Sequence, residues 1–179
     1  MLSIRAMTPQ DAAFIADYFC LGSPEYFENM GIDPKKIPNR ESYFKSLLQL
    51  IETPKEKAKA FYSVWLIDGE PVGHSGLKDI IFGEFGSQHL HLWKTQERGK
   101  GYGAKLFCLS SLDFYDRFSL KKLICEPRAS NLLPNRMLAK IGFPKLGSRV
   151  AASSEISQVC ELNTYAIEKE TAKKFLSDF

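Results

Sequence analysis

Residues 97–103, Glu-Arg-Gly-Lys-Gly-Tyr-Gly, combine three glycines with an arginine and a lysine. An apolar helical pattern follows, from Gly103 to Phe118. Glycines let the backbone approach a ligand closely, and the N–H groups at a helix start point at an anion, aided by the helix dipole. Arg98 and Lys100 add positive charge. The stretch therefore predicts a cradle for a phosphate or a diphosphate.

The glycine spacing leaves more than one kind of ligand open. Gly99, Gly101 and Ala104 satisfy the dinucleotide pattern G-x-G-x-x-G/A, which is typical of nicotinamide-dependent oxidoreductases. In that fold the first glycine follows its strand almost at once, whereas five polar residues, 94–98, intervene here. The Walker pattern fails, because Lys100 is followed by glycine instead of Ser or Thr. A turn that merely starts a helix is the structural alternative.

Glu126 is the first candidate for acid–base chemistry. It ends a predicted strand, Lys122 to Glu126, and open α/β sheets bind their ligands at the carboxyl ends of strands. We expect partial burial to raise its pKa and make it a better proton acceptor. The structural alternative is a carboxylate that caps the next turn or pairs with Arg128.

Three histidines supply further candidates. His89 and His91 lie two residues apart and therefore on one face of a strand, where either could accept a proton near neutral pH. His74 could complete a metal site with them, but no carboxylate motif accompanies the three, so we expect no metal. At least one of them is expected to be a hydrogen-bonded core histidine, and His91 is the second candidate for the base.

Alternating strand and helix patterns must position these residues. Strands are expected at 2–5, 62–67, 71–77, 89–93, 122–126, 145–151 and 158–167, and helices from 8 to 18, after 39, from 103 to 118, from 134 to 141 and after 170. Residues 21–38 read as a loop. The order predicts an antiparallel meander followed by strand–helix–strand–helix and a closing hairpin.

Composition limits the class of protein. The 179 residues fit one domain, 1–179, with 44% hydrophobic and 25% charged residues. A net charge of +3 without a Lys/Arg block argues against nucleic acid, and no stretch is long enough to span a membrane. The four cysteines are far apart and form no C-x-x-C pair, so free thiols in a reducing compartment are expected. Together with the lack of a signal-peptide pattern, this predicts a cytoplasmic protein.

Two motifs at a suitable separation carry a family resemblance. The loop with Arg98-x-x-Gly101-x-Gly103 resembles the acetyl-CoA-binding motif of the GNAT superfamily of N-acyltransferases. A second stretch, Glu126-Pro-Arg-Ala-Ser-Asn131 running on to Lys140-Ile-Gly-Phe143, resembles the next motif of that superfamily. Its form is close to the ribosomal-protein alanine N-acetyltransferases, and the general layout is similar to the serine-specific group.

The resemblance implies a fold and a set of site residues. The fold class is mixed α/β: a mostly antiparallel sheet of six or seven strands, with a splayed fourth strand and helices on both faces. The ligand of the cradle would be the diphosphate of acetyl-CoA. The residues implied for coenzyme binding are His91, Leu92, Trp93, Arg98, Gly99, Lys100, Gly101, Tyr102, Gly103, Ala104, Asn131 and Asn135. At the end of the fourth strand, backbone groups would hold the pantetheine and polarise the thioester.

The chain departs from the family at the proton donor. The alanine acetyltransferases have a tyrosine where this chain has Leu138, and the serine-type relatives have a serine where it has Pro134. A non-catalytic acyl-CoA-binding module therefore stands as the alternative to an N-acetyltransferase, and an oxidoreductase as a weaker one. Glu126 would be the base by resemblance, and the acceptor would be a protein N-terminus or a small amine.

The acceptor pocket is expected between residues 21–38 and the hairpin at 153–158. Tyr26 and Phe27 could form a wall of the pocket. Acidic residues there could attract a cationic amine, and these are Glu25, Glu28, Asp33 and Glu155. The protein is expected to be a monomer or a homodimer.

Overall fold

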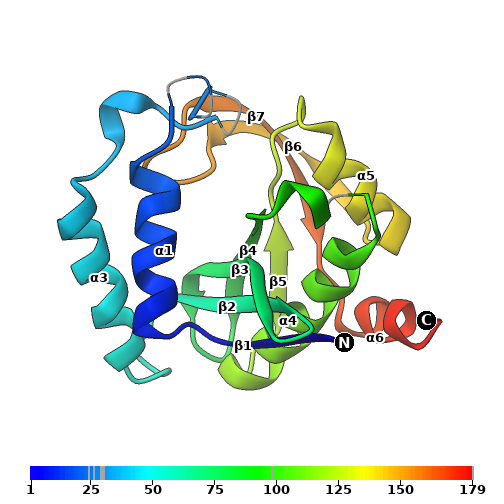
Figure 1. Cartoon of the computed structure of the whole chain (residues 1–179). Helices are drawn as coiled ribbons and strands as arrows, with labels where there is room; N and C mark the ends of the chain where they lie inside the picture. Colours follow the sequence, from blue (N-terminus) through cyan, green and yellow to red (C-terminus); the bar gives the residue numbers. More distant parts are fainter. Residues whose placement is uncertain (24, 26, 29–30, 98, 179) are drawn as a thin grey trace.

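The chain folds around a seven-stranded sheet (Figure 1). The structure is a computed structural model that describes residues 1–23, 25, 27–28, 31–97 and 99–178. The strand order is β1-β2-β3-β4-β5-β7-β6, and every pair is antiparallel except β4–β5. The strands are β1 (Leu2–Ala6), β2 (Ala60–Ile67), β3 (Glu70–Ile81), β4 (Phe85–Leu92), β5 (Lys122–Cys125), β6 (Lys145–Ala152) and β7 (Val159–Ala166). The mixed, mostly antiparallel sheet expected from the resemblance is thus confirmed.

Helices cover both faces of this sheet (Figure 1). Helices α1 and α3 pack on one face with a core that includes Ile15, Phe19 and Leu47, while α4, α5 and α6 enclose a second core around Phe107 and Phe114. Their bounds, with those of two short 3₁₀ helices, are α1 (Pro9–Cys20), η1 (Pro34–Lys36), α3 (Arg40–Glu52), η2 (Thr95–Glu97), α4 (Tyr102–Phe118), α5 (Leu132–Ile141) and α6 (Lys169–Ser177).

Local sequence signals set several of these boundaries. Thr8 caps α1 in a capping box with Asp11, and Pro9 occupies the first helical position. The side chain of Asn39 accepts hydrogen bonds from two amides at the start of α3. Gly142 ends α5 in the left-handed conformation that favours glycine. These helices were predicted from the same residues.

A buried polar network fixes α4 against the centre of the sheet. Gln88 on β4 donates to Ser75 Oγ at 3.0 Å and to the carbonyl of Phe107 at 3.2 Å, and it accepts from Ser111 Oγ at 2.8 Å. Because buried polar groups are costly without partners, these bonds favour one placement of the helix on the sheet. The start of α4 is thereby held in a fixed relation to β4.

The four cysteines are free thiols, as expected, with Cys108 and Cys125 buried and Cys20 and Cys160 half-buried. Burial raises the pKa of both Cys108 and Cys125 to about 12, so neither thiol ionises near neutral pH. Among the described residues, no helix combines the length and apolar character needed to cross a bilayer.

Candidate active site

The sheet opens between β4 and β5. Their parallel pairing runs from Phe85–Lys122 to Gln88–Cys125 and stops there, while β4 stays paired with β3 through Leu92. The two strands therefore separate after Gln88 and Cys125. The resemblance predicted this splayed fourth strand. His89 and Glu126 are the first residues beyond the last pair, so they begin the two arms of the opening.

Trp93 follows β4 in a different role from the predicted one. Its amide donates to the carbonyl of Val72 at 2.8 Å, so this N–H is not available to a ligand. Its indole N–H donates to His74 Nδ1 at 2.9 Å, and its ring lies 4.6 Å from that of Phe14. Trp93 thus connects β4 to the histidine on β3 and to α1.

The predicted cradle lies at the start of α4. Gly101 is the N-cap with φ of 82°, a left-handed conformation that favours glycine, and none of the described side chains caps the helix. A Cβ added at Gly99, Gly101 or Gly103 would meet no atom within 4 Å, so the surface over the loop is open. The first N–H groups of an α-helix have no intrahelical acceptor. Within the part of the chain that the structure describes, these amides are thus open to an anion, and the cradle stays a prediction.

The side chains around the cradle differ in what they can contribute. Tyr102 and Ala104 are half-buried and pack against the core. Lys100 Nζ lies 3.0 Å from Glu97 Oε2 in an exposed ion pair, which is weak enough for the lysine to turn toward a phosphate. Arg98 lies outside the described residues.

The two asparagines separate into a ligand candidate and a structural residue. Asn131 is the exposed N-cap of α5, but its side chain makes no capping bond, which argues against the purely structural alternative. Asn135 Nδ2 donates to the carbonyls of Arg128 and Asn131 at 2.9 and 2.7 Å. Its Oδ1 accepts from Asn163 and Tyr165. With both amide hydrogens and both acceptor positions used, Asn135 fixes the turn before α5 instead of holding a coenzyme.

Glu126 is buried and paired, contrary to the expected proton-accepting carboxylate. Arg149 Nε and Nη2 donate to its two oxygens at 2.8 and 2.5 Å, and Thr164 Oγ1 donates at 2.8 Å. These hydrogen bonds from Arg149, with a smaller one from Thr164, lower the pKa of Glu126 in spite of its burial. The prediction of a raised pKa is therefore wrong, and the partner is Arg149, not Arg128.

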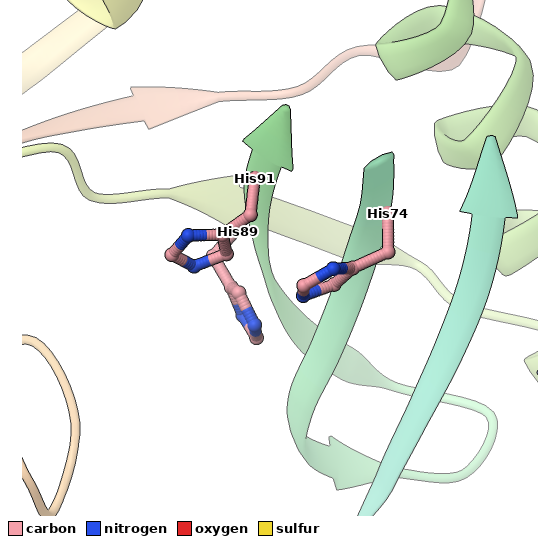
Figure 2. A group of neighbouring side chains, drawn as sticks. All are labelled: His74, His89 and His91. Carbon is pink, nitrogen blue, oxygen red and sulfur yellow. The ribbon is translucent and has the colours of Figure 1, made fainter. Parts of the chain in front are cut away.

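All three histidines of the chain gather on one face of the sheet (Figure 2). His74 and His91 are direct partners in the β3–β4 register, with stacked rings 5.0 Å apart. His89 lies opposite Gly76, where a Cβ would come within 2.2 Å of the imidazole, so the glycine makes room for the ring. Tyr18 Oη lies 3.4 Å from His91 Nδ1.

Burial keeps these imidazoles neutral. It lowers the pKa of His91 to about 4, and burial together with the neighbouring imidazoles lowers those of His74 and His89 well below the ordinary value. Lys78, on the same face, adds to the effect on His89. At neutral pH each ring therefore has one nitrogen that carries no hydrogen. His74 uses this nitrogen to accept from Trp93, and His91 can still act as a proton acceptor.

This arrangement predicts a loss of stability in mild acid. A histidine with a lowered folded-state pKa binds its proton mainly in the unfolded chain, so stability falls as the pH drops below 6.5 toward the folded value. For His91 alone the loss reaches about 3 kcal/mol near pH 4. We expect the free energy of unfolding in urea to be lower at pH 5.5 than at pH 7.5. Both pH values lie above the range where carboxyl groups titrate (about pH 4), so the difference reports the histidines. In His91→Gln the pH slope should be shallower; an equal slope would contradict the assignment.

The acceptor side matches its prediction only in part. Residues 21–38 and the hairpin at 153–158 do lie together, since Ile32 and Ser157 form a β-bridge and Asp33 N–H donates to the carbonyl of Ile156 at 2.8 Å. Phe27 is buried in the core with α1 and α3, so it is not a pocket wall. Tyr26 lies outside the described residues. Glu25, Glu28 and Glu155 are exposed, as a surface that attracts a cation requires.

Comparison with known proteins decides the family. The family model of the acetyltransferase (GNAT) domain matches residues 1–144. The chain belongs to the GNAT acetyltransferase family. It is accordingly an acetyl-CoA-dependent N-acetyltransferase, with acetyl-CoA as its co-substrate. No curated protein matches the sequence.

Solved structures share the GNAT fold at low sequence identity. A ribosomal L7/L12 α-N-protein acetyltransferase in complex with coenzyme A is similar with a TM-score of 0.73, 14% identity, and 95% of each chain covered. The ribosomal-protein-S5-alanine acetyltransferase of Vibrio fischeri is similar with a TM-score of 0.68 and 19% identity, and the match covers 94% of this chain and 93% of that protein. An aminoglycoside acetyltransferase in complex with coenzyme A is similar with a TM-score of 0.70 and 16% identity, and the match covers 97% of this chain and 98% of that protein. Similarity to these GNAT proteins shows the fold and leaves the acceptor open.

Proposed function

We propose that this GNAT protein transfers the acetyl group of acetyl-CoA directly to a primary amine in a ternary complex. One observation carries the proposal: α4 connects β4 to the parallel strand β5, so its N-terminus, which no described side chain caps, lies at the end of the sheet where these two strands separate. The helix N-terminus suits a diphosphate, and the gap between the strands suits an extended arm. Family membership makes acetyl-CoA the molecule with both parts.

Each part of the coenzyme has its own contacts in this proposal. The amides of Gly101 to Ala104 hold the diphosphate, with Lys100 as a mobile counter-charge. The edge of β4 that extends beyond the pairing with β5 holds the pantetheine, and one of its N–H groups polarises the thioester carbonyl. Asn131 binds the arm from the opposite side of the opening through its uncommitted side chain.

We infer that His91, not Glu126, accepts the proton from the amine. Glu126 is held by Arg149 and Thr164, whereas His91 keeps a neutral ring beside the opening. Once the amine nitrogen has attacked the acyl carbon, its N–H is far more acidic than that of a free ammonium. An imidazole of low basicity is then able to take the proton. Neither family proton donor is present, because Leu138 and Pro134 occupy the positions of the family tyrosine and serine, and Leu138 is fully buried in the core. Water therefore protonates the departing thiolate.

The acceptor that we propose is a protein N-terminus, with a small amine as the other outcome. Two of the structural neighbours are named for ribosomal proteins, and another for aminoglycosides. The exposed acidic residues on segments 21–38 and 153–158 favour a cationic acceptor of either kind.

A screen of acceptors tests the proposed function. The protein is incubated with acetyl-CoA and one acceptor in the presence of EDTA, and release of the coenzyme A thiol is measured. The acceptors are peptides with an N-terminal Ala or Ser, spermidine, and an aminoglycoside. We expect saturable turnover with one class, and binding of acetyl-CoA but not of NAD in calorimetry. Binding without turnover for any amine would support a non-catalytic acyl-CoA-binding module, and binding of NAD alone would support the oxidoreductase.

Substitution of Glu126 distinguishes the two candidate bases. We expect Glu126→Gln to lower kcat by less than about tenfold, because His91 remains, and to cost about 1–2 kcal/mol of stability through the weakened contact with Arg149. Steady-state kinetics and urea unfolding measure the two effects. Arg149→Gln is the matched control, since it breaks the same ion pair and leaves the carboxylate. A hundredfold or greater fall of kcat in Glu126→Gln alone would make Glu126 the base (general acid–base catalysis contributes about 10²–10⁴).

A further inference from the structure

The histidine trio, His74, His89 and His91, has the ligand set of a metal site. Each ring offers one nitrogen, and the three ligand atoms lie within 4.8 Å of one another. Figure 2 shows the three rings on the same side of β3 and β4, with no strand between them. Zinc bound by three imidazoles keeps its nitrogen ligands about 3.3 Å apart at bond lengths of about 2.0–2.1 Å. Ring rotations that move each nitrogen by about 1 Å would close the site.

Unpartnered ring nitrogens point to a missing ligand at the same place. His74 Nε2 and His89 Nδ1 are buried and have no hydrogen-bond partner among the described residues. A buried polar atom without a partner is costly, so two of them in one cluster call for a shared ligand. His91 uses its Nδ1 toward Tyr18, which leaves its Nε2 for that ligand.

We propose that the histidine trio binds one Zn²⁺ ion, with a fourth position open to water. Neutral imidazole is the form that binds a metal, and the trio is neutral at physiological pH. His74 is fully buried, whereas His89 and His91 are only half-buried, so the ion enters and keeps its open position on their side. The site shares His91 with the proposed function, so bound Zn²⁺ would block the base and inhibit acetyl transfer. Its failure would leave the proposed function untouched.

The hydrogen bond from Trp93 to His74 competes with metal binding, so its loss would be a specific sign that the metal is bound. An indole N–H only donates, so the hydrogen bond from Trp93 to His74 Nδ1 places the ring hydrogen on Nε2. A metal on Nε2 requires the other tautomer, with the hydrogen on Nδ1, and this tautomer cannot accept from the indole. Metal binding must therefore release Trp93 from His74 and change the fluorescence of the indole.

The test uses the full chain, freed of metal with a chelator, and Co²⁺ as a spectroscopic probe for Zn²⁺. We expect one equivalent of Co²⁺ to give the intense visible bands of a tetrahedral site without the charge-transfer band of a thiolate. One equivalent of Zn²⁺ should displace it and alter the Trp fluorescence. No binding at millimolar Co²⁺ and Zn²⁺, or a thiolate band that disappears in Cys20→Ser with Cys160→Ser, would overturn the proposal.

Two variants make the test specific. His89→Gln, checked for folding by circular dichroism, should bind Zn²⁺ at least about tenfold more weakly, since even outer contacts of metal sites cost that much when removed. Trp93→Phe removes the competing N–H and should bind Zn²⁺ more tightly than the wild type. Unchanged affinity in both variants, or weaker binding in Trp93→Phe with an intact fold, would contradict the assignment.

Discussion

His91→Gln is expected to lower kcat by about 10²–10⁴-fold and to leave the affinity for acetyl-CoA unchanged. The loss follows from removing the proton acceptor at the opening between β4 and β5. The coenzyme contacts that we propose on β4 are backbone groups, which glutamine keeps. The measurement is steady-state turnover with the best amine of the acceptor screen, together with calorimetry of acetyl-CoA binding. EDTA is included, because a ring nitrogen cannot hold a metal ion and accept a proton at once.

The pH profile separates a lost base from a damaged fold. Because burial lowers the pKa of His91 to about 4 and those of His74 and His89 well below the ordinary value, no histidine of the trio should titrate between about pH 6 and 8 in the wild type. The rate should then rise with pH along the deprotonation of the acceptor amine alone. A change of the wild-type rate that titrates near pH 6.5 would contradict the role of His91. So would a kcat of His91→Gln within about threefold of the wild type.

Gly103→Asp is expected to weaken acetyl-CoA binding by about thirtyfold or more without destabilising the protein. Gly103 lies in the first turn of α4, and a Cβ there meets no atom within 4 Å. A carboxylate in that turn interacts well with the helix dipole, so the fold should be as stable as the wild type or more so. It would repel the diphosphate by about 2 kcal/mol, which corresponds to about thirtyfold in Kd.

Gly103→Asn is the matched control for this variant. It has nearly the same shape without the charge, so it should bind acetyl-CoA within about threefold of the wild type. Calorimetry gives the affinities and thermal unfolding gives the stabilities. Equal losses in both variants would mean that the side chain blocks the site by bulk. No loss in Gly103→Asp would place the diphosphate elsewhere.

Much of the fold could be predicted because its signals are local. Thr8 with Pro9, Asn39 and Gly142 mark helix ends by their own chemistry, and the alternation of apolar residues identifies the strands. The cradle belongs to the same class, since a glycine-rich stretch before a helix specifies exposed amides whatever packs around it.

The role of each side chain depended on contacts that sequence spacing does not contain. Arg149 on β6 reaches Glu126 across β7, which lies between β6 and β5 in the sheet, and nothing near Glu126 in the chain indicates that partner. The pairing of His74 with His91 depends on the exact register of β3 and β4. That register also contains an irregularity between Lys78 and Ile81, which periodicity alone does not locate.

Phe27 illustrates the same limit for an aromatic residue in a loop. Its neighbours, rich in glycine, proline and asparagine, favoured an exposed pocket wall. In the structure it is helical and 6% exposed, because it packs into the core with residues of α1 and α3. Burial of a single loop residue depends on tertiary packing, for which a short sequence window carries no signal.

The most direct measurement follows the amide resonances of Gly101, Gly103 and Ala104 by NMR during addition of acetyl-CoA. Binding of the diphosphate to these N–H groups predicts large shifts with acetyl-CoA and none with acetyl-pantetheine, which lacks the diphosphate. Unchanged resonances at saturating acetyl-CoA, or equal shifts with both compounds, would contradict the claim that the start of α4 holds the coenzyme.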